Sequence, residues 1–248
     1  MNKGQRIDAR AAQNAQQIQP QDRAFCAVLQ TPAMEIKPGR GGWQHGTYAR
    51  PGGERLLRFR LKSPRGSGPF PLLIFLHGAG RNGYEGRNAL AHAFIVRLHL
   101  ALFCRRKLHL LVPQLGWEEH YDSDHFSNHL SGAIEKLGRV DHSRIYIIGI
   151  SMGGCGVFSE CRRHPGCYAA AIPAVGWADA SWAAAMARTP MWLAYSHEEE
   201  PYNAPICEAL KQHGADVKMT RKTTFGHKMT GPFFMFQPWA KWLLSHSK

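Results

Sequence analysis

The sequence predicts an α/β protein whose core is a mostly parallel, doubly wound sheet of eight strands with helices on both faces. Three observations support this prediction. Short apolar runs typical of buried strands alternate with longer segments of helical pattern along most of the chain. A glycine-flanked serine follows one of these runs and opens a helical segment. The length of 248 residues, 44% of them hydrophobic, suffices for one large domain with a full core.

Residues 1–40 differ from the rest of the chain. They contain a stretch rich in Gln, Ala and Asn, and they show little apolar periodicity. We therefore expect residues 1–40 to be an N-terminal extension that is flexible or only loosely docked, and residues 41–248 to form the folded domain.

The predicted elements of this domain follow one another in alternation. Strands at 44–50 and 55–62 are separated by a Pro-Gly-Gly turn, and the second alternates apolar and basic residues as a strand with one wet face does. The continuous apolar run PLLIFL at 71–76 predicts a strand covered on both faces. Further strands are expected near 108–114, 144–150, 168–176, 191–196 and 217–224, and helices near 88–103, 127–137, 178–188, 204–213 and 233–245.

The strand at 144–150 runs directly into the motif Gly149-Ile150-Ser151-Met152-Gly153, which is followed by a helical segment. This order is typical of a nucleophile elbow, a turn so tight that the residues two before and two after the serine must lack side chains. The pattern G-x-S-x-G by itself is common in loops, but here it occurs between a strand and a helix. We therefore predict that Ser151 is a catalytic nucleophile.

A second glycine-rich stretch, His77-Gly78-Ala79-Gly80, follows the buried strand at 71–76. Acyl transfer requires two backbone N–H donors for the oxyanion, and losing one donor typically costs about 10²- to 10³-fold in rate. In hydrolases with a serine elbow, one donor belongs to the residue after the nucleophile, here Met152, and the other to the loop after an earlier strand. We assign the second donor to Ala79, with Gly80 as the near alternative, and expect a structural role for His77.

The chain contains fourteen histidines, so the general base is chosen by position. In this architecture the triad runs in the order serine, acid, histidine along the chain. Among the histidines after Ser151, His227 lies in a glycine-containing loop directly after the last predicted strand, from which it can reach back to the serine. We therefore predict that His227 is the general base.

The acid is expected in the loop after the strand at 191–196, which reads His197-Glu198-Glu199-Glu200-Pro201. Three adjacent glutamates are ordinarily a solvated charge run at the start of a helix. One of them can instead be buried against the Nδ1 atom of the general base, since glutamate is an accepted triad acid. We choose Glu199, with Glu200 and Glu198 as alternatives.

Four stretches, LLIFLHGAG, RIYIIGISMGGCG, AAAIPAVG and FGH ahead of a terminal helix, resemble the α/β-hydrolase superfamily. They are most similar to small esterases akin to feruloyl esterases and polyhydroxyalkanoate depolymerases, and the likeness extends from about Leu56 to the C-terminus. The resemblance implies an α/β-hydrolase catalytic domain at 41–248 and a serine esterase that forms an acyl-enzyme on a small-molecule ester. It also implies that no metal or organic cofactor is used. A peptidase or acyltransferase would use the same serine, and a non-catalytic binding protein on this scaffold is a further alternative.

A polar and aromatic loop at 116–126 is predicted at the carboxyl end of a strand, where open α/β sheets bind ligands. Trp117 and Tyr121 in this loop, and Trp177 in another, are candidates for pocket walls. Each could equally serve loop packing, so none is assigned a catalytic role.

The net charge of +13 is concentrated near the N-terminus, where residues 1–70 carry 12 Lys and Arg against 4 Asp and Glu. Such a surface could bind nucleic acid or an anionic membrane. The basic residues are dispersed rather than clustered, so we favour a solvated surface and expect no nucleic-acid partner.

The first residues lack the apolar segment of a secretory signal, and no apolar run is long enough to span a membrane. We therefore expect a cytoplasmic protein; its oligomeric state is not predicted.

The six cysteines include no C-x-x-C pair, so we expect reduced thiols, mostly buried. A disulfide between Cys161 and Cys167 is the alternative for an exported protein.

Overall fold

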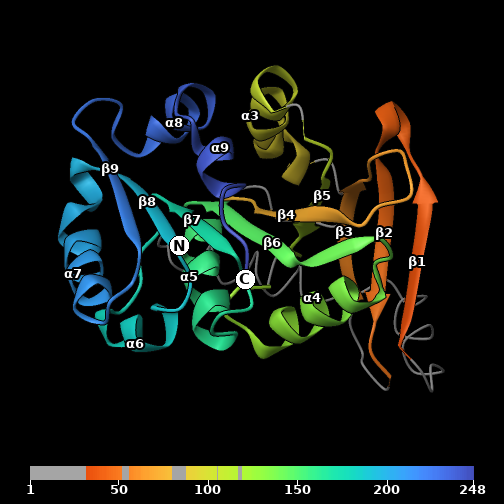
Figure 1. The fold of residues 1–248 in the computed structure, drawn as a ribbon, viewed down its shortest axis with the longest axis horizontal. Coiled ribbons are helices and arrows are strands. Elements are labelled where there is room, and N and C mark those ends of the chain that lie inside the picture. The colour runs from red at the N-terminus through yellow and green to blue at the C-terminus, as the bar shows by residue number, and fades with distance from the viewer. Residues whose placement is uncertain (1–31, 52–55, 80–87, 105, 117–118) are drawn as a thin grey trace, which may run out of the picture.

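The computed structural model describes residues 32–51, 56–79, 88–104, 106–116 and 119–248. In these residues, nine strands form one sheet in the order β1-β2-β3-β5-β4-β6-β7-β8-β9. Figure 1 shows the sheet running across the molecule, with helices above and below it. The fold class predicted from the sequence, a mostly parallel α/β sheet covered on both faces, is confirmed.

The sheet has an antiparallel part and a parallel part. Its antiparallel pairs join β1 (Ala33–Pro38), β2 (Gln44–Ala49), β3 (Leu56–Lys62) and β5 (His109–Gln114). The parallel pairs join β5 to β4 (Phe70–Leu76), then β6 (Val140–Ile150), β7 (Ala170–Ala174), β8 (Met191–Ser196) and β9 (Val217–Lys222). The carboxyl ends of the parallel strands therefore share one edge, where ligands bind in such sheets.

Helices cover the two faces of the sheet in two groups, which Figure 1 shows on opposite sides. One group consists of α3 (Asn88–Phe103), α8 (Thr230–Phe236) and α9 (Trp239–Leu243). The other consists of α4 (Asp124–Lys136), α5 (Met152–Arg163), α6 (Ala183–Met186) and α7 (Glu200–Gln212). Successive residues of a strand point to opposite faces, so Ile74 joins the core under α4 to α7, while Leu73 and Phe75 join the core under α3, α8 and α9. This alternation produces two separate hydrophobic cores.

The number of strands differs from the eight predicted, because β1 lies within the stretch expected to be an extension. It pairs with β2 along all six of its residues, and Met34 and Ile36 pack against the core. With only two large apolar residues, Met34 and Ile36, the segment carries a weak strand signal, and pairing with β2 rather than its own pattern stabilises it. Residues 1–31 of that predicted extension lie outside the described residues.

Two predicted helices are divided or shortened in the structure. The expected C-terminal helix at 233–245 is divided into α8 and α9, which are separated at Gln237–Pro238. Proline lacks the backbone N–H that would continue the helical hydrogen bonds, so the chain turns there. The helix predicted at 178–188 is reduced to the short α6 preceded by the single turn η2 (Ala180–Trp182).

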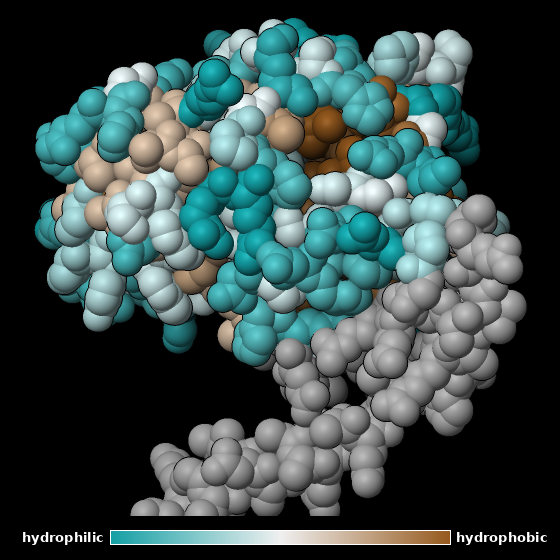
Figure 2. Space-filling model, turned by 90° about the horizontal axis from the view of Figure 1, so that it is seen from below, coloured by the Kyte–Doolittle hydropathy of each residue, from teal (hydrophilic) through white to brown (hydrophobic). Residues whose placement is uncertain are grey.

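Figure 2 views the molecule from the side of α4 to α7 and shows a largely hydrophilic surface interrupted by a hydrophobic area. None of the helices in the described part of the chain combines the length and the apolarity needed to cross a bilayer.

The packing of α8 and α9 generates a first prediction. Trp239 is fully buried, its ring packs on Phe234, and its indole N–H donates to the Phe234 carbonyl at 2.8 Å. We expect Trp239→Ala to lower the free energy of unfolding by about 3–5 kcal/mol, because it leaves a large cavity. Phe236 in α8 is 78% exposed, so Phe236→Ala should change stability by no more than about 0.5 kcal/mol. Urea denaturation measures both, and equal effects would contradict the packing described.

Candidate active site

Ser151 occupies the turn between β6 and α5. Its backbone has φ 58° and ψ −119°, a region that non-glycine residues rarely adopt. Its N–H donates to the Ala174 carbonyl of the adjacent strand at 2.8 Å, which fixes the turn against β7. The structure thus gives Ser151 the backbone geometry of a nucleophile elbow.

The glycines on either side of Ser151 are required by the space available. A Cβ atom on Gly149 would lie 2.2 Å from the Gly153 carbonyl oxygen, and one on Gly153 would lie 2.2 Å from the Leu76 carbonyl oxygen. The neighbouring atoms are backbone, so they cannot move aside as a flexible side chain would. Any larger residue at either position would displace α5 from the end of β4 or β6.

His227 lies in the single turn η4 (Gly226–Met229), which follows β9. The chain enters this turn through two residues with positive φ, Phe225 at 72° and Gly226 at 47°. The turn brings the Nε2 atom of His227 to 2.9 Å from the Oγ atom of Ser151, although the two residues are 76 positions apart. The imidazole is half-exposed, so it can be reached from solvent.

Glu199 lies on the far side of the imidazole, and its Oε1 atom is 2.8 Å from the Nδ1 atom of His227. An ionised carboxylate only accepts hydrogen bonds, so Nδ1 carries the ring proton in a neutral imidazole and Nε2 is left as an acceptor for the Ser151 hydroxyl. The three side chains therefore form one hydrogen-bonded line from carboxylate to hydroxyl.

A capping box holds the Glu199 carboxylate in place. Its second oxygen, Oε2, accepts a hydrogen bond from the Ser196 backbone N–H at 2.8 Å and a short one from the Ser196 hydroxyl. Burial raises the pKa of the Glu199 carboxyl, but the hydrogen bonds from Ser196 and His227 outweigh burial and keep the pKa below its ordinary value. The Glu199 carboxylate is therefore ionised at neutral pH.

The two neighbouring glutamates have other partners. The Glu200 carboxylate forms an exposed ion pair with Arg221 at 2.6 Å. The Glu198 carboxylate lies beside Gly226, where an added Cβ would meet it at 2.7 Å, and no hydrogen bond joins it to His227 in the described residues. Of the three glutamates left open by the sequence, Glu199 is the one that contacts the imidazole.

A signal in the sequence distinguishes Glu199 from its neighbours, although our sequence interpretation did not use it. Ser196 and Glu199 form the pattern S-x-x-E, the signature of a capping box, in which the glutamate folds back onto the backbone of the serine. Asn203 is a second residue without a prior assignment. Its Nδ2 atom donates to the carbonyls of Gly176 at 2.9 Å and Glu199 at 3.0 Å, and so joins the loops after β7 and β8.

Of the two residues predicted to supply oxyanion donors, one follows Ser151 directly in the chain, and the other follows Gly78, which packs against Ser151. Met152 is the first residue of α5, so its N–H has no partner within the helix. Ala79 is exposed and follows Gly78, which packs closely enough that an added Cβ would lie 3.4 Å from the Ser151 Cβ. Gly80, the alternative, lies outside the described residues.

His77 and His92 hold the loop that contains Ala79. The buried His77 accepts a hydrogen bond at Nε2 from the Leu115 N–H at 3.2 Å, and its Nδ1 atom is 3.0 Å from the Gly78 carbonyl. The Gly78 N–H donates to His92 Nδ1 at 3.1 Å. The structural role predicted for His77 is confirmed, whereas His92 carried no signal in the sequence.

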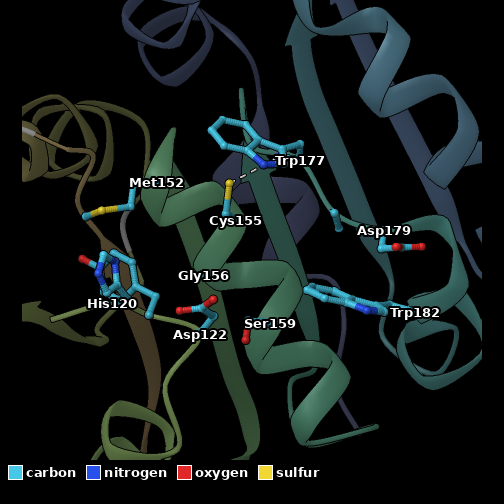
Figure 3. A pocket seen from close by; sticks show the side chains of 11 residues that line it. His120, Asp122, Met152, Cys155, Gly156, Ser159, Trp177, Asp179 and Trp182 are labelled. Carbon is cyan, nitrogen blue, oxygen red and sulfur yellow. Dashed lines mark hydrogen bonds between the residues drawn. The ribbon is translucent and has the colours of Figure 1, made fainter. Parts of the chain in front are cut away.

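A cavity of about 290 Å³ opens beside the elbow. Figure 3 shows Cys155, Gly156 and Ser159 along one side of α5, with Trp177 and Trp182 to one side of them and His120 and Asp122 to the other. Tyr121 also lines this cavity, but it is buried and its hydroxyl accepts a hydrogen bond from the His77 N–H. Trp177 is 53% exposed at the rim, and Trp117 lies outside the described residues.

The described part of the chain contains no group of three or more His, Cys, Asp or Glu side chains that could hold a metal ion. Its five cysteines are free thiols, including Cys161 and Cys167, so the alternative of a disulfide between these two is wrong. Two of the five are buried and one, Cys167, is exposed. Cys26 lies outside the described residues.

A parallel sheet covered on both faces, with a serine elbow at its carboxyl edge, defines the class of α/β-hydrolases. Residues 50–222 match the model of the family described as "Putative esterase", which covers more than half of the chain. The chain belongs to this esterase family. The membership confirms the family and enzyme class predicted from the sequence.

Solved structures with similar folds include esterases and a peptidase. A thermostable esterase is 24% identical with a TM-score of 0.74, and the match covers 84% of this chain and 64% of that one. Acylaminoacyl peptidase from Pyrococcus horikoshii is 14% identical with a TM-score of 0.63, covering 89% of this chain and 43% of that one. A ferulic acid esterase is 14% identical with a TM-score of 0.59, covering 86% and 98%.

These likenesses establish the fold alone. The chain spans less than two thirds of the length of the first two structures, so their full activities do not transfer to it. No curated protein matches the sequence.

The lowered pKa of Glu199 generates a second prediction. A carboxyl whose pKa is lower in the folded state than in the unfolded chain stabilises the fold when ionised, and this contribution is lost as the pH falls through the folded-state pKa. We therefore expect the stability difference between the wild-type protein and Glu199→Gln to be largest above about pH 5 and to shrink as the pH falls toward about 3. Urea denaturation at several pH values measures it. A difference that stays constant or grows on acidification would contradict the assignment.

Proposed function

We propose that this protein is a serine hydrolase that cleaves carboxylic esters through an acyl-enzyme, with Ser151 as nucleophile, His227 as general base and Glu199 as the orienting acid. The observation that carries the proposal is the continuous hydrogen-bonded line through these three side chains, at 2.9 Å and 2.8 Å. Membership of an esterase family supports the choice of an ester as substrate.

In the first half of the reaction, the Ser151 Oγ atom attacks the ester carbonyl carbon while His227 Nε2 takes the hydroxyl proton. The imidazolium that forms is stabilised by the Glu199 carboxylate at Nδ1, which also prevents the ring from turning. The tetrahedral intermediate then collapses, the bond to the alcohol oxygen breaks, and Nε2 returns its proton to the departing alcohol. The acyl group remains on Ser151.

In the second half, water replaces the alcohol. The water oxygen attacks the acyl-enzyme carbonyl carbon while His227 Nε2 removes a proton from the water. The bond from the carbonyl carbon to Ser151 Oγ then breaks, Nε2 gives its proton to Ser151 Oγ, and the carboxylic acid leaves. The half-exposed position of His227 supports this step, because water must reach Nε2 after the alcohol has gone.

The negative oxygen of both tetrahedral intermediates needs donors that are already in place. We assign this role to the backbone N–H groups of Met152 and Ala79. The N–H at the start of α5 also benefits from the positive end of the helix dipole. The hydrogen bonds of His77 and His92 to the loop support the position of Ala79, because they restrict the preceding residue, Gly78.

We place the acyl or alcohol group of the ester in the cavity beside α5. Met152 and Cys155, both within one turn of Ser151, line this cavity, so a group attached to the reacting carbon can extend directly into it. Its volume of about 290 Å³ suits a small organic group rather than a polymer segment. The Trp177 and Trp182 rings provide apolar walls.

The triad generates a third prediction. We expect a fluorophosphonate probe to label the wild-type protein at Ser151, and Ser151→Ala to lose the label and to lower kcat/KM for an aryl ester by about 10⁴-fold or more. Glu199→Gln should lower kcat by about 10³- to 10⁴-fold, because the imidazole loses its orienting charge.

Glu200→Gln is the matched control, since it removes an adjacent carboxylate that pairs with Arg221 instead of His227. It should retain activity within about threefold. Equal losses in the two glutamine variants, or labelling that persists in Ser151→Ala, would contradict the proposed triad. Parallel assays with an amide and with an alcohol acceptor separate ester hydrolysis from peptidase and acyltransferase activity.

The cavity generates a fourth prediction. Trp177→Ala removes an exposed wall without opening the core, so we expect kcat/KM to fall about 10-fold for aryl esters of bulky acids and to change little for acetate esters. Phe236→Ala is the control. It removes another exposed ring, one that does not line this cavity, and it should affect neither substrate. A uniform loss across acyl sizes would contradict the placement of the substrate in this cavity.

A further inference from the structure

A second cavity, of about 350 Å³, lies at the opposite edge of the sheet from Ser151. Its walls come from the end of β3, the last turns of α3 and the start of β5. Because β5 runs parallel to β4 and β4 to β6, the start of β5 is at the amino edge, whereas Ser151 follows the carboxyl end of β6. A six-residue strand such as β5 spans roughly 20 Å, so the cavity is separate from the candidate active site.

The inner part of this second cavity is apolar. Its lining includes Leu100 of α3, Cys104 just beyond that helix, and Leu108 and Leu110 at the start of β5. Leu110 is buried, and the other three are partly buried and pack against the core. An apolar ligand would therefore contact a surface that is continuous with the hydrophobic core.

The lining of the second cavity also contains basic residues. Four cationic residues line it: Lys62, Arg97, Arg106 and Lys107. Among the described residues, the lining contains no Asp or Glu, and none of the four forms an ion pair with an acidic side chain. Lys62 donates to the Gly41 carbonyl at 3.3 Å, and Arg97 lies over the Phe94 ring. Four cations around an apolar cavity create a positive potential that attracts an anion.

A helix dipole accounts for only part of this arrangement. Cations are favoured near the C-terminus of a helix, and Arg106 and Lys107 follow the end of α3. Lys62 belongs to a different element, β3, and Arg97 lies well before the end of α3. Basic residues of β3 and α3, at least 35 positions apart in the sequence, thus line the same apolar cavity.

We propose that this second cavity binds an amphiphilic monocarboxylate, a fatty acid of medium length. A guanidinium group matches a carboxylate with two parallel hydrogen bonds, and ammonium groups add further charge. The alkyl chain would lie on the leucine-lined interior, where each buried methylene raises affinity by up to about fourfold. Binding here does not involve Ser151, so it is independent of the proposed esterase activity.

Isothermal titration calorimetry of the full-length protein with sodium decanoate, below its micellar concentration, tests the proposal. We expect one saturable site at the second cavity, affinity that rises from hexanoate to decanoate, and binding of the uncharged 1-decanol about tenfold weaker. The double variant Arg97→Gln/Lys107→Gln should bind decanoate about tenfold more weakly or worse. Ala101→Trp should also weaken binding, because it fills the cavity from an exposed helix position.

The matched control is Arg188→Gln/Lys211→Gln, which removes the same charge from exposed positions that do not line the cavity and should bind as the wild type does. Ala101→Trp removes no buried group, so it tests the cavity even if the charge variants lower the Tm. Absence of saturable binding, or equal affinity in the cavity variants and the control, would overturn the proposal. Binding only to vesicles of phosphatidylcholine and phosphatidylglycerol, with none to free decanoate, would overturn it in favour of a membrane surface.

Discussion

The close approach of α5 to the carboxyl end of β4 is the constraint on which the rest of the site depends. At Gly153 there is no room for even one methyl group beside the Leu76 carbonyl. This contact allows the helix to start directly after Ser151, whose backbone adopts a sparsely populated conformation that the surrounding structure must stabilise. The strain is confined to this turn, and the hydrophobic cores on both faces of the sheet stabilise the elements that flank it.

Hydrogen bonds then connect the loops at the carboxyl edge into one unit. Asn203 joins the loop after β7 to the one after β8, the capping box of Ser196 and Glu199 fixes the carboxylate, and the carboxylate contacts His227 in the loop after β9. Each loop alone could move, whereas the connected loops hold the imidazole at hydrogen-bond distance from the serine. These hydrogen bonds hold His227 in position although its imidazole is half-exposed.

The two cavities at opposite edges of the sheet have different electrostatic character. The cavity beside the elbow has the carboxylates of Asp122 and Asp179 in its lining, whereas the described residues that line the cavity at the amino edge include four cations and no carboxylate. The excess of positive charge in the sequence is therefore not spread evenly over these two surfaces. Such a difference favours an anionic ligand at the amino edge over the cavity beside the elbow.

The sequence by itself determined the fold class and the candidates Ser151 and His227, because an elbow is a local motif and the order of elements along a parallel sheet fixes which loops meet. Among the three adjacent glutamates, the S-x-x-E pattern of Ser196 and Glu199 favours Glu199, but only the folded chain shows which carboxylate faces the imidazole. It also did not reveal β1, which is stabilised by pairing with β2. Only the tertiary structure revealed the basic cavity. Its charged residues come from β3, α3 and the segment before β5, and they share no pattern in the sequence because folding brings them together.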